Sequence, residues 1–146
     1  DYTDYDTVII WLGTNNGLTD TLDTDVDPFG GYNDFAETET GYYCRIIETV
    51  KDANPDARIV LMNIFATKSD VKTTNETINK IAAKYDLHVI DTKSLSMDKN
   101  TDLHAGLKNP HFGKGGNIAA ARLIIRDMGN YFAERPLRCE YGVSTA

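Results

Sequence analysis

The stretch that decides the fold occupies residues 6–16 and reads Asp6-Thr7-Val8-Ile9-Ile10-Trp11-Leu12-Gly13-Thr14-Asn15-Asn16. It joins a continuous apolar run, residues 7–12, to a glycine and a polar turn. An unbroken apolar run of this length is typical of a strand that is buried on both faces of a parallel sheet. We therefore expect a central strand here, with a sharp turn at Gly13.

The rest of the chain alternates between strand and helix patterns. Apolar runs recur at residues 58–63 and 87–91, and apolar residues at helical spacing predict three buried helix faces: Tyr43, Ile46, Ile47 and Val50; Val71, Ile78, Ile81, Ala82 and Tyr85; and Ala121, Ile125, Met128 and Phe132. Crossovers of this length make the strands parallel, with right-handed connections. The sequence thus predicts an α/β fold, a three-layer αβα sandwich with a parallel sheet. We expect residues 1–136 to be the C-terminal portion of such a domain, incomplete at its N-terminal side, and residues 137–146 to be a tail that leaves it.

Composition and charge exclude several classes of partner. The 146 residues are 41% hydrophobic and 25% charged, which is ordinary for a soluble globular domain. A net charge of −7 should repel nucleic acid and anionic lipid, so we expect neither as a partner. The longest apolar run, Val8 to Leu12, is too short to cross a bilayer, so we expect no membrane anchor.

Metal, redox and modification signals are weak. Cys44 and Cys139 have no zinc-finger or redox spacing, and Pro28 stands where a calcium loop needs glycine. A solvated acidic loop is therefore preferred to a calcium site at the carboxylates Asp20, Asp23, Asp25 and Asp27. Residues 75–77 fit the glycosylation triplet, a pattern that often arises by chance.

The candidate site lies where the strands end, because open α/β sheets bind ligands outside the carboxyl ends of their strands. The polar residues expected there are Gly13 to Asn16, Asn63, Asp91, and the loop with His104 and His111. The amide of Asn15 can stabilise an oxyanion, although Asn side chains in such a turn also bond local backbone. His111 precedes an Ala-rich helix and can shuttle protons, although a lone loop His is more often a surface residue. His88, inside a strand, is expected to be structural.

Two blocks together, Gly13-Thr14-Asn15-Asn16 and residues 109–121, resemble the SGNH/GDSL hydrolase family. The resemblance implies that Asn15, in the family's Gly-x-Asn-Asp block, is an oxyanion donor, with Asn16 in place of the usual Asp. It also implies that His111 is the catalytic base, followed by Gly116 and the helix with Ala121. It covers roughly residues 4–136.

The chain departs from the family pattern at the residue that orients the base. Lys108 stands where the family has an Asp, three positions before His111. Asp102 is a candidate substitute. Asp102-Leu103-His104 is also a competing match, which we rank below His111 because the glycine and helix that follow it are poorly spaced.

The family's nucleophile is a further departure, because no Gly-Asp-Ser occurs in the chain. The resemblance implies that the nucleophilic Ser belongs to a segment preceding Gly13, and we expect that segment to cover the edge of the first strand. Completed in this way, the domain would be an ester hydrolase that needs no cofactor, acting on carbohydrate O-acyl or small acyl esters. Three aromatic residues offer flat faces for sugar rings: Phe29, Tyr32 and Phe35.

Two alternatives stay open. One is a non-catalytic glycan-binding or structural module of the same fold, for example within a bacteriophage tail protein, which would make it extracellular or virion-associated. The other is a flavodoxin-like regulator or nucleotide binder, although no glycine-rich phosphate loop follows the first strand.

Overall fold

The computed structural model describes residues 2–18, 35, 37–65, 71–95 and 114–134. Within these residues a parallel sheet has the strand order β1-β2-β3, formed by β1 (Thr7–Ile10), β2 (Arg58–Met62) and β3 (His88–Ile90). Ile10 pairs with Leu61, and Met62 pairs with Ile90. The carboxyl ends of the three strands therefore meet at one edge of the sheet.

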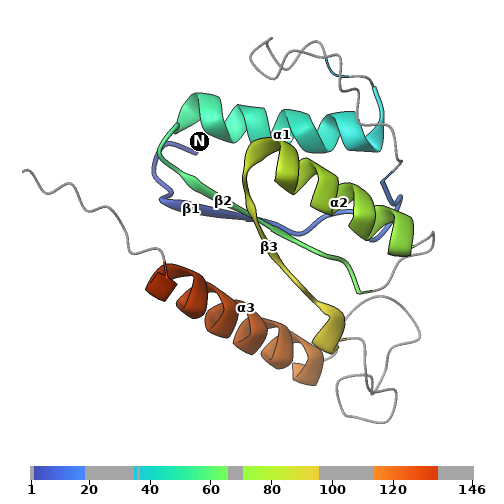
Figure 1. Cartoon of the computed structure of the whole chain (residues 1–146), viewed down its shortest axis with the longest axis vertical. Coiled ribbons are helices and arrows are strands. Elements are labelled where there is room, and N and C mark those ends of the chain that lie inside the picture. Colours follow the sequence, from blue (N-terminus) through green and yellow to red (C-terminus); the bar gives the residue numbers. More distant parts are fainter. Residues whose placement is uncertain (1, 19–34, 36, 66–70, 96–113, 135–146) are drawn as a thin grey trace, which may run out of the picture.

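Three helices enclose the sheet in two layers. Helices α1 (Glu39–Ala53) and α2 (Val71–Tyr85) cover one face, and α3 (Lys114–Glu134) covers the other (Figure 1). A short 3₁₀ helix, Lys93–Leu95, follows β3. This arrangement is the predicted three-layer α/β sandwich with a parallel sheet.

The face covered by α1 and α2 has the core that the periodicity predicts. Ile47, Val50, Ile78 and Ile81 are fully buried there, and Tyr43 is nearly so. Capping residues stand at both ends of α1. Thr38 is the N-cap, and its hydroxyl accepts a hydrogen bond from the N–H of Gly41 at 3.1 Å; Asn54 is the C-cap.

The prediction of a central first strand, buried on both faces, is wrong for the described part of the chain. β1 is an edge strand there, and its Ile9 is 40% exposed. Alternate residues of a strand point to opposite faces, and Ile10 packs under α1 and α2, so Ile9 faces the side of α3. The position of α3 leaves this face of β1 partly uncovered (Figure 1).

The predicted buried face of α3 is wrong in part. Met128 is buried, but Ala121 is exposed and Ile125 is 73% exposed. The helix instead buries Gly116, Ala120, Leu123 and Met128 against the sheet. Because α3 is apolar on more than one side, its outward side exposes a second stripe at Ile118, Ala121 and Ile125.

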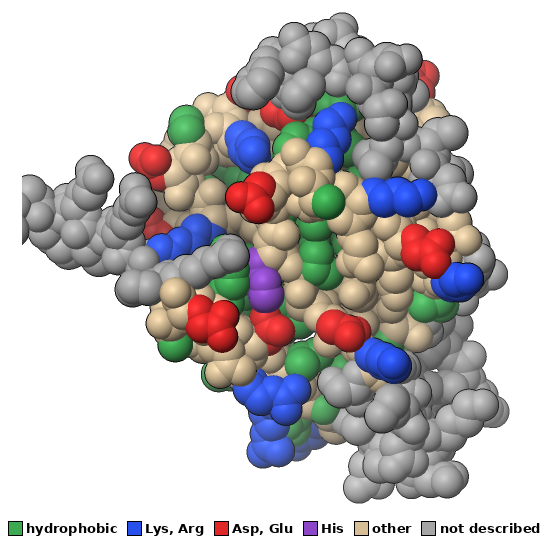
Figure 2. Space-filling model, in the orientation of Figure 1, with side chains coloured by type: hydrophobic (Ala, Val, Ile, Leu, Met, Phe, Trp, Pro, Cys, Tyr) green, Lys and Arg blue, Asp and Glu red, His purple; other side chains and the backbone are tan. Residues whose placement is uncertain are grey.

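On the face shown in Figure 2, side chains of Lys and Arg are interspersed with those of Asp and Glu rather than gathered into a basic patch.

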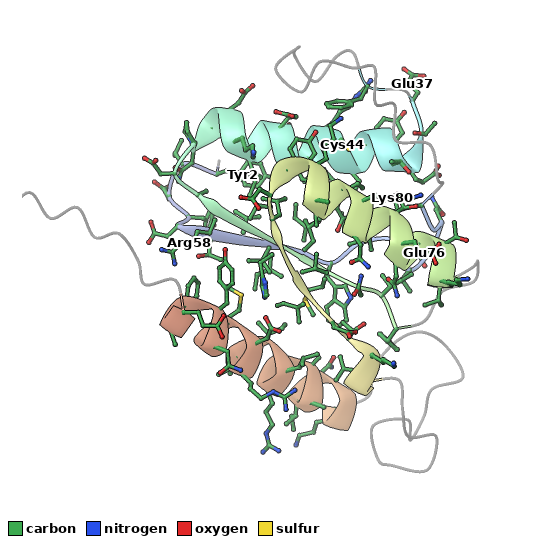
Figure 3. The ribbon with its side chains drawn as sticks, in the orientation of Figure 1. Tyr2, Glu37, Cys44, Arg58, Glu76 and Lys80 are labelled. Atoms are coloured by element: carbon green, nitrogen blue, oxygen red, sulfur yellow. The ribbon has the colours of Figure 1, made fainter. Side chains whose placement is uncertain are left out.

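Arg58, at the amino end of β2 (Figure 3), places its guanidinium 4.7 Å from the ring centroid of Phe132 on α3. This contact joins the sheet to α3 by a cation–π interaction.

Candidate active site

The candidate site lies at the carboxyl edge of the sheet. The loop with Gly13 continues from β1, Asn63 directly follows β2, and Asp91 directly follows β3. The indole N–H of Trp11 donates to the carbonyl oxygen of Asn63 at 3.1 Å, which ties the end of β1 to the end of β2. The predicted convergence of these polar positions at one edge is therefore present.

Two glycines shape the turn after β1. Gly13 has φ +114° and Gly17 has φ +73°, a region that favours glycine because it has no Cβ. The N–H of Gly17 donates to the carbonyl oxygen of Gly13 at 3.0 Å, so residues 13–17 close into one compact turn. Leu18 then enters the core, with 6% of its surface exposed. The turn therefore presents Thr14, Asn15 and Asn16 at its tip.

The two asparagines of the turn differ in their contacts. The amide of Asn16 donates to a carboxylate oxygen of Glu39 at 3.3 Å. Asn15 is exposed, and among the described residues its side-chain amide has no hydrogen-bond partner. Hydrogen bonding to neighbouring residues thus accounts for the amide of Asn16 but not for that of Asn15. The N–H groups of the Asn15 amide are available to a ligand.

A cavity of about 400 Å³ opens beside this turn, between it and α1. Leu12, Tyr42 and Ile46 form apolar walls next to Asn15, and Glu39 adds a carboxylate. The side chains of Leu12 and Tyr42 are about half exposed, at 48% and 49%. The space can therefore take an uncharged group with an apolar part, with an amide donor at its side.

Tyr43 also borders the cavity, but its hydroxyl has a structural role. The hydroxyl donates to the carbonyl oxygen of Ile10 at 3.4 Å, which holds α1 against β1. Burial, with a smaller contribution from neighbouring Cys44, raises the pKa of Tyr43 far above its ordinary value. The phenol is therefore a neutral structural donor across the physiological pH range.

Helix α2 supports the strand ends with three polar residues that the sequence patterns did not single out for this role. The Leu18 N–H donates to the Thr74 hydroxyl, Asn75 bonds the backbone of Ile64, and the Asn63 amide donates to Asn79 at 3.3 Å. For Thr74 and Asn75, the sequence signal that could have indicated this role is the polar run Thr73-Thr74-Asn75 within a helix. Asn75 is engaged on both sides of its amide, so the glycosylation triplet is not a free acceptor.

Most of the other predicted residues lie outside the part of the chain that the structure describes. They are His111, His104, Asp102, Phe29, Tyr32, Cys139, the acidic loop at 20–27 and the tail at 137–146. Phe35 is described and only 5% exposed, so the prediction that it stacks on a sugar ring is wrong.

His88 belongs to a different region, at the amino end of β3. Its Nε2 lies 2.5 Å from a carboxylate oxygen of Asp127, and its ring stacks on Tyr131 with centroids 4.2 Å apart. These contacts fix α3 to β3, as expected of a structural residue, and they lie at the end of the strand opposite the Asn15 turn.

Within the described ranges, no group of three or more His, Cys, Asp or Glu side chains is arranged to hold a metal ion. None of the helices in the same ranges is long and apolar enough to cross a membrane.

Together, the fold and the turn define a class: a parallel α/β sandwich that presents an amide donor beside a cavity at the carboxyl ends of its strands. The model of the GDSL-like Lipase/Acylhydrolase family matches residues 1–117. The chain therefore belongs to this family, and with it to a superfamily of hydrolases and esterases. No match was found among curated proteins or among solved structures.

Proposed function

We propose that this chain provides the oxyanion donor and the base of an ester hydrolase. The observation that carries the proposal is the Asn15 amide, which is exposed at the carboxyl end of β1, faces the cavity and has no partner among the described residues. An amide donor in such a place can stabilise the negative charge that develops on a carbonyl oxygen during acyl transfer. Membership of the acylhydrolase family supports the same chemistry.

The proposed reaction follows the scheme of serine hydrolases. A Ser hydroxyl attacks the ester carbonyl while His111 accepts its proton, and Asn15 donates a hydrogen bond to the tetrahedral oxyanion. Collapse of this intermediate breaks the ester bond, and His111 returns the proton to the departing alcohol. Water, activated by the same His, then releases the acid and restores the Ser.

The nucleophilic Ser comes, in this proposal, from another segment that pairs with the open edge of β1. Ile9 of β1 and Ile118 of α3 are 40% and 45% exposed, and Ile125 is 73% exposed. The exposed Ile9 on an unpaired strand indicates that another element covers β1, and the stripe on the outward side of α3 is a second apolar surface that another part of the same segment would cover. A strand added beside β1 would end next to Gly13, which would bring its carboxyl-end side chains close to Asn15.

The proposed substrate is a small acyl ester, including acyl groups on carbohydrate. The half-exposed Tyr42 offers an aromatic face at the cavity, and Leu12 adds an apolar wall. An aromatic face beside polar donors suits a sugar ring, and a short apolar wall suits an acetyl-sized group.

The test uses the complete domain, meaning this chain together with the segment that carries the Ser. Asn15→Ala should lower kcat for hydrolysis of p-nitrophenyl acetate by about a hundredfold or more, because one oxyanion donor is lost. Asn16→Ala is the matched control, and it should lose less than about tenfold because its amide already bonds Glu39. Unchanged turnover in Asn15→Ala rules the proposal out.

The rival function is a non-catalytic glycan-binding module. It is favoured by two departures from the family pattern: Asn16 and Lys108 stand where the family has Asp. A fluorophosphonate probe separates the two functions, because it labels an activated Ser and leaves a binding module unlabelled. Labelling that disappears in His111→Ala supports the hydrolase.

A further inference from the structure

One buried side chain of α2 contacts both ends of the turn that carries Asn15. The hydroxyl oxygen of Thr74 accepts a hydrogen bond from the N–H of Leu18 at 3.1 Å, and Thr74 is only 1% exposed. Leu18 and Thr74 are 56 positions apart in the sequence, so this is a tertiary contact. It anchors the end of the turn where the chain re-enters the core.

The methyl group of the same Thr74 packs against the beginning of the turn. A Cβ placed on Gly13 would lie 3.2 Å from Thr74 Cγ2, which is closer than nine in ten real Cβ contacts. The absence of a side chain at Gly13 is therefore what allows Thr74 to approach. Together with the bond from Gly17 N–H to Gly13 O, these contacts fix the turn at its start and at its end.

We infer that Thr74 is a positioning residue for the amide of Asn15, an inference that rests on the function proposed above. Without its hydroxyl, the N–H of Leu18 is left buried and unpaired, and the turn must shift to satisfy it. An oxyanion donor acts only within hydrogen-bond distance of the developing charge, and a misplacement of about 1 Å is enough to lose much of the rate. Thr74 thus acts on catalysis through the turn, without contacting the substrate.

The first test compares three α2 variants in the complete domain. Thr74→Val keeps the shape of the side chain and removes the hydroxyl, so kcat should fall about tenfold or more while KM changes less than about threefold. Thr74→Ser keeps the hydroxyl and should restore most of kcat. Ile78→Val, also buried on α2, destabilises the same helix without touching the turn and should keep kcat. The inference is overturned if Thr74→Val keeps its kcat, or if Ile78→Val loses as much.

The second test needs no activity. Amide hydrogen exchange at Leu18, measured on the same samples, should become about tenfold faster or more in Thr74→Val and stay near the unmodified rate in Thr74→Ser and Ile78→Val. Unchanged exchange at Leu18 contradicts the inference even if the protein hydrolyses no ester.

The two proposals fail in different ways. If Asn15→Ala keeps full turnover, the oxyanion role proposed for Asn15 is wrong, and exchange at Leu18 alone decides whether Thr74 restrains the turn. If Asn15→Ala loses turnover and Thr74→Val does not, the function stands and the positioning role of Thr74 is wrong.

Discussion

Asn75 on α2 bonds both backbone groups of Ile64, the second residue after β2. Its side-chain oxygen accepts from the Ile64 N–H at 2.8 Å, and its amide nitrogen donates to the Ile64 carbonyl at 2.8 Å. Ile64 is 1% exposed, so water cannot easily replace the side chain as a partner. One asparagine therefore supplies the hydrogen bonds that the chain loses when it leaves the sheet.

The first prediction concerns this pair. Asn75→Ala should lower the free energy of unfolding by about 1–3 kcal/mol, because it leaves buried backbone groups unpaired. Urea denaturation followed by circular dichroism measures the change. Glu76→Ala is the matched control. Glu76 lies on the outer side of α2 (Figure 3), where it pairs with Lys72 at 3.8 Å in solvent. Its replacement should lower the free energy of unfolding by about 0.5 kcal/mol or less. Equal effects of the two variants would contradict the buried role of Asn75.

The second prediction concerns the turn glycine. Gly13→Ala should destabilise the protein by about 1–2 kcal/mol, because φ +114° is strained for alanine and the new Cβ meets Thr74 Cγ2 at 3.2 Å. Gly129→Ala provides the comparison, since nothing lies within 4 Å of a Cβ there and an exposed helical glycine gains stability as alanine. Thermal unfolding should shift downward in the first variant and upward in the second. A higher melting temperature in Gly13→Ala would show that the turn does not hold this backbone conformation.

The third prediction is a loss of stability at alkaline pH. Burial raises the pKa of Tyr43 and Tyr85 above their ordinary 10.0, and that of Cys44, which lies on α1 (Figure 3), above its ordinary 9.0. As pH rises through 9 and 10, these groups ionise first in the unfolded chain, so the folded state holds more protons. The free energy of unfolding must then fall with increasing pH.

The measurement is the urea midpoint at about pH 8 and about pH 10.5, values on either side of the ordinary pKa of these groups. The midpoint should be lower at the higher pH, and Tyr43→Phe should reduce the difference, because one of the titrating groups is removed. A midpoint that is the same at both pH values would contradict the burial of these side chains.

The fourth prediction tests the exposed stripe of α3. Ile125→Asp should change the stability of this chain alone by less than about 0.5 kcal/mol, because Ile125 is 73% exposed. In the complete domain the same change should cost about 2 kcal/mol or more, because the added segment would bury the new charge. Ile78→Asp should be severely destabilising in both proteins, since Ile78 is fully buried in either case. A small effect of Ile125→Asp in the complete domain would mean that no segment covers this side of α3.

Local sequence determined the elements and their order. The apolar runs around Ile10, Leu61 and Ile90 became parallel strands, because each is short and apolar and each is followed by a helical pattern long enough for a crossover. Gly13 was identifiable for a similar reason: a glycine at the end of such a run marks the sharp turn. The placement of Asn15 beyond the strand follows from the same pattern.

Tertiary structure decided which apolar side of α3 faces the sheet and which residues support the Asn15 turn. Ala120 and Ala121 are neighbours with the same chemistry, and only the position of the sheet buries the first and exposes the second. The exposure of Ile9 likewise depends on how far α3 covers its face of β1. The contact of Thr74 with Leu18 depends on how α2 packs against the end of β1. Periodicity describes one element at a time, whereas these contacts form between elements distant in the sequence, so they exist only once the layers are assembled.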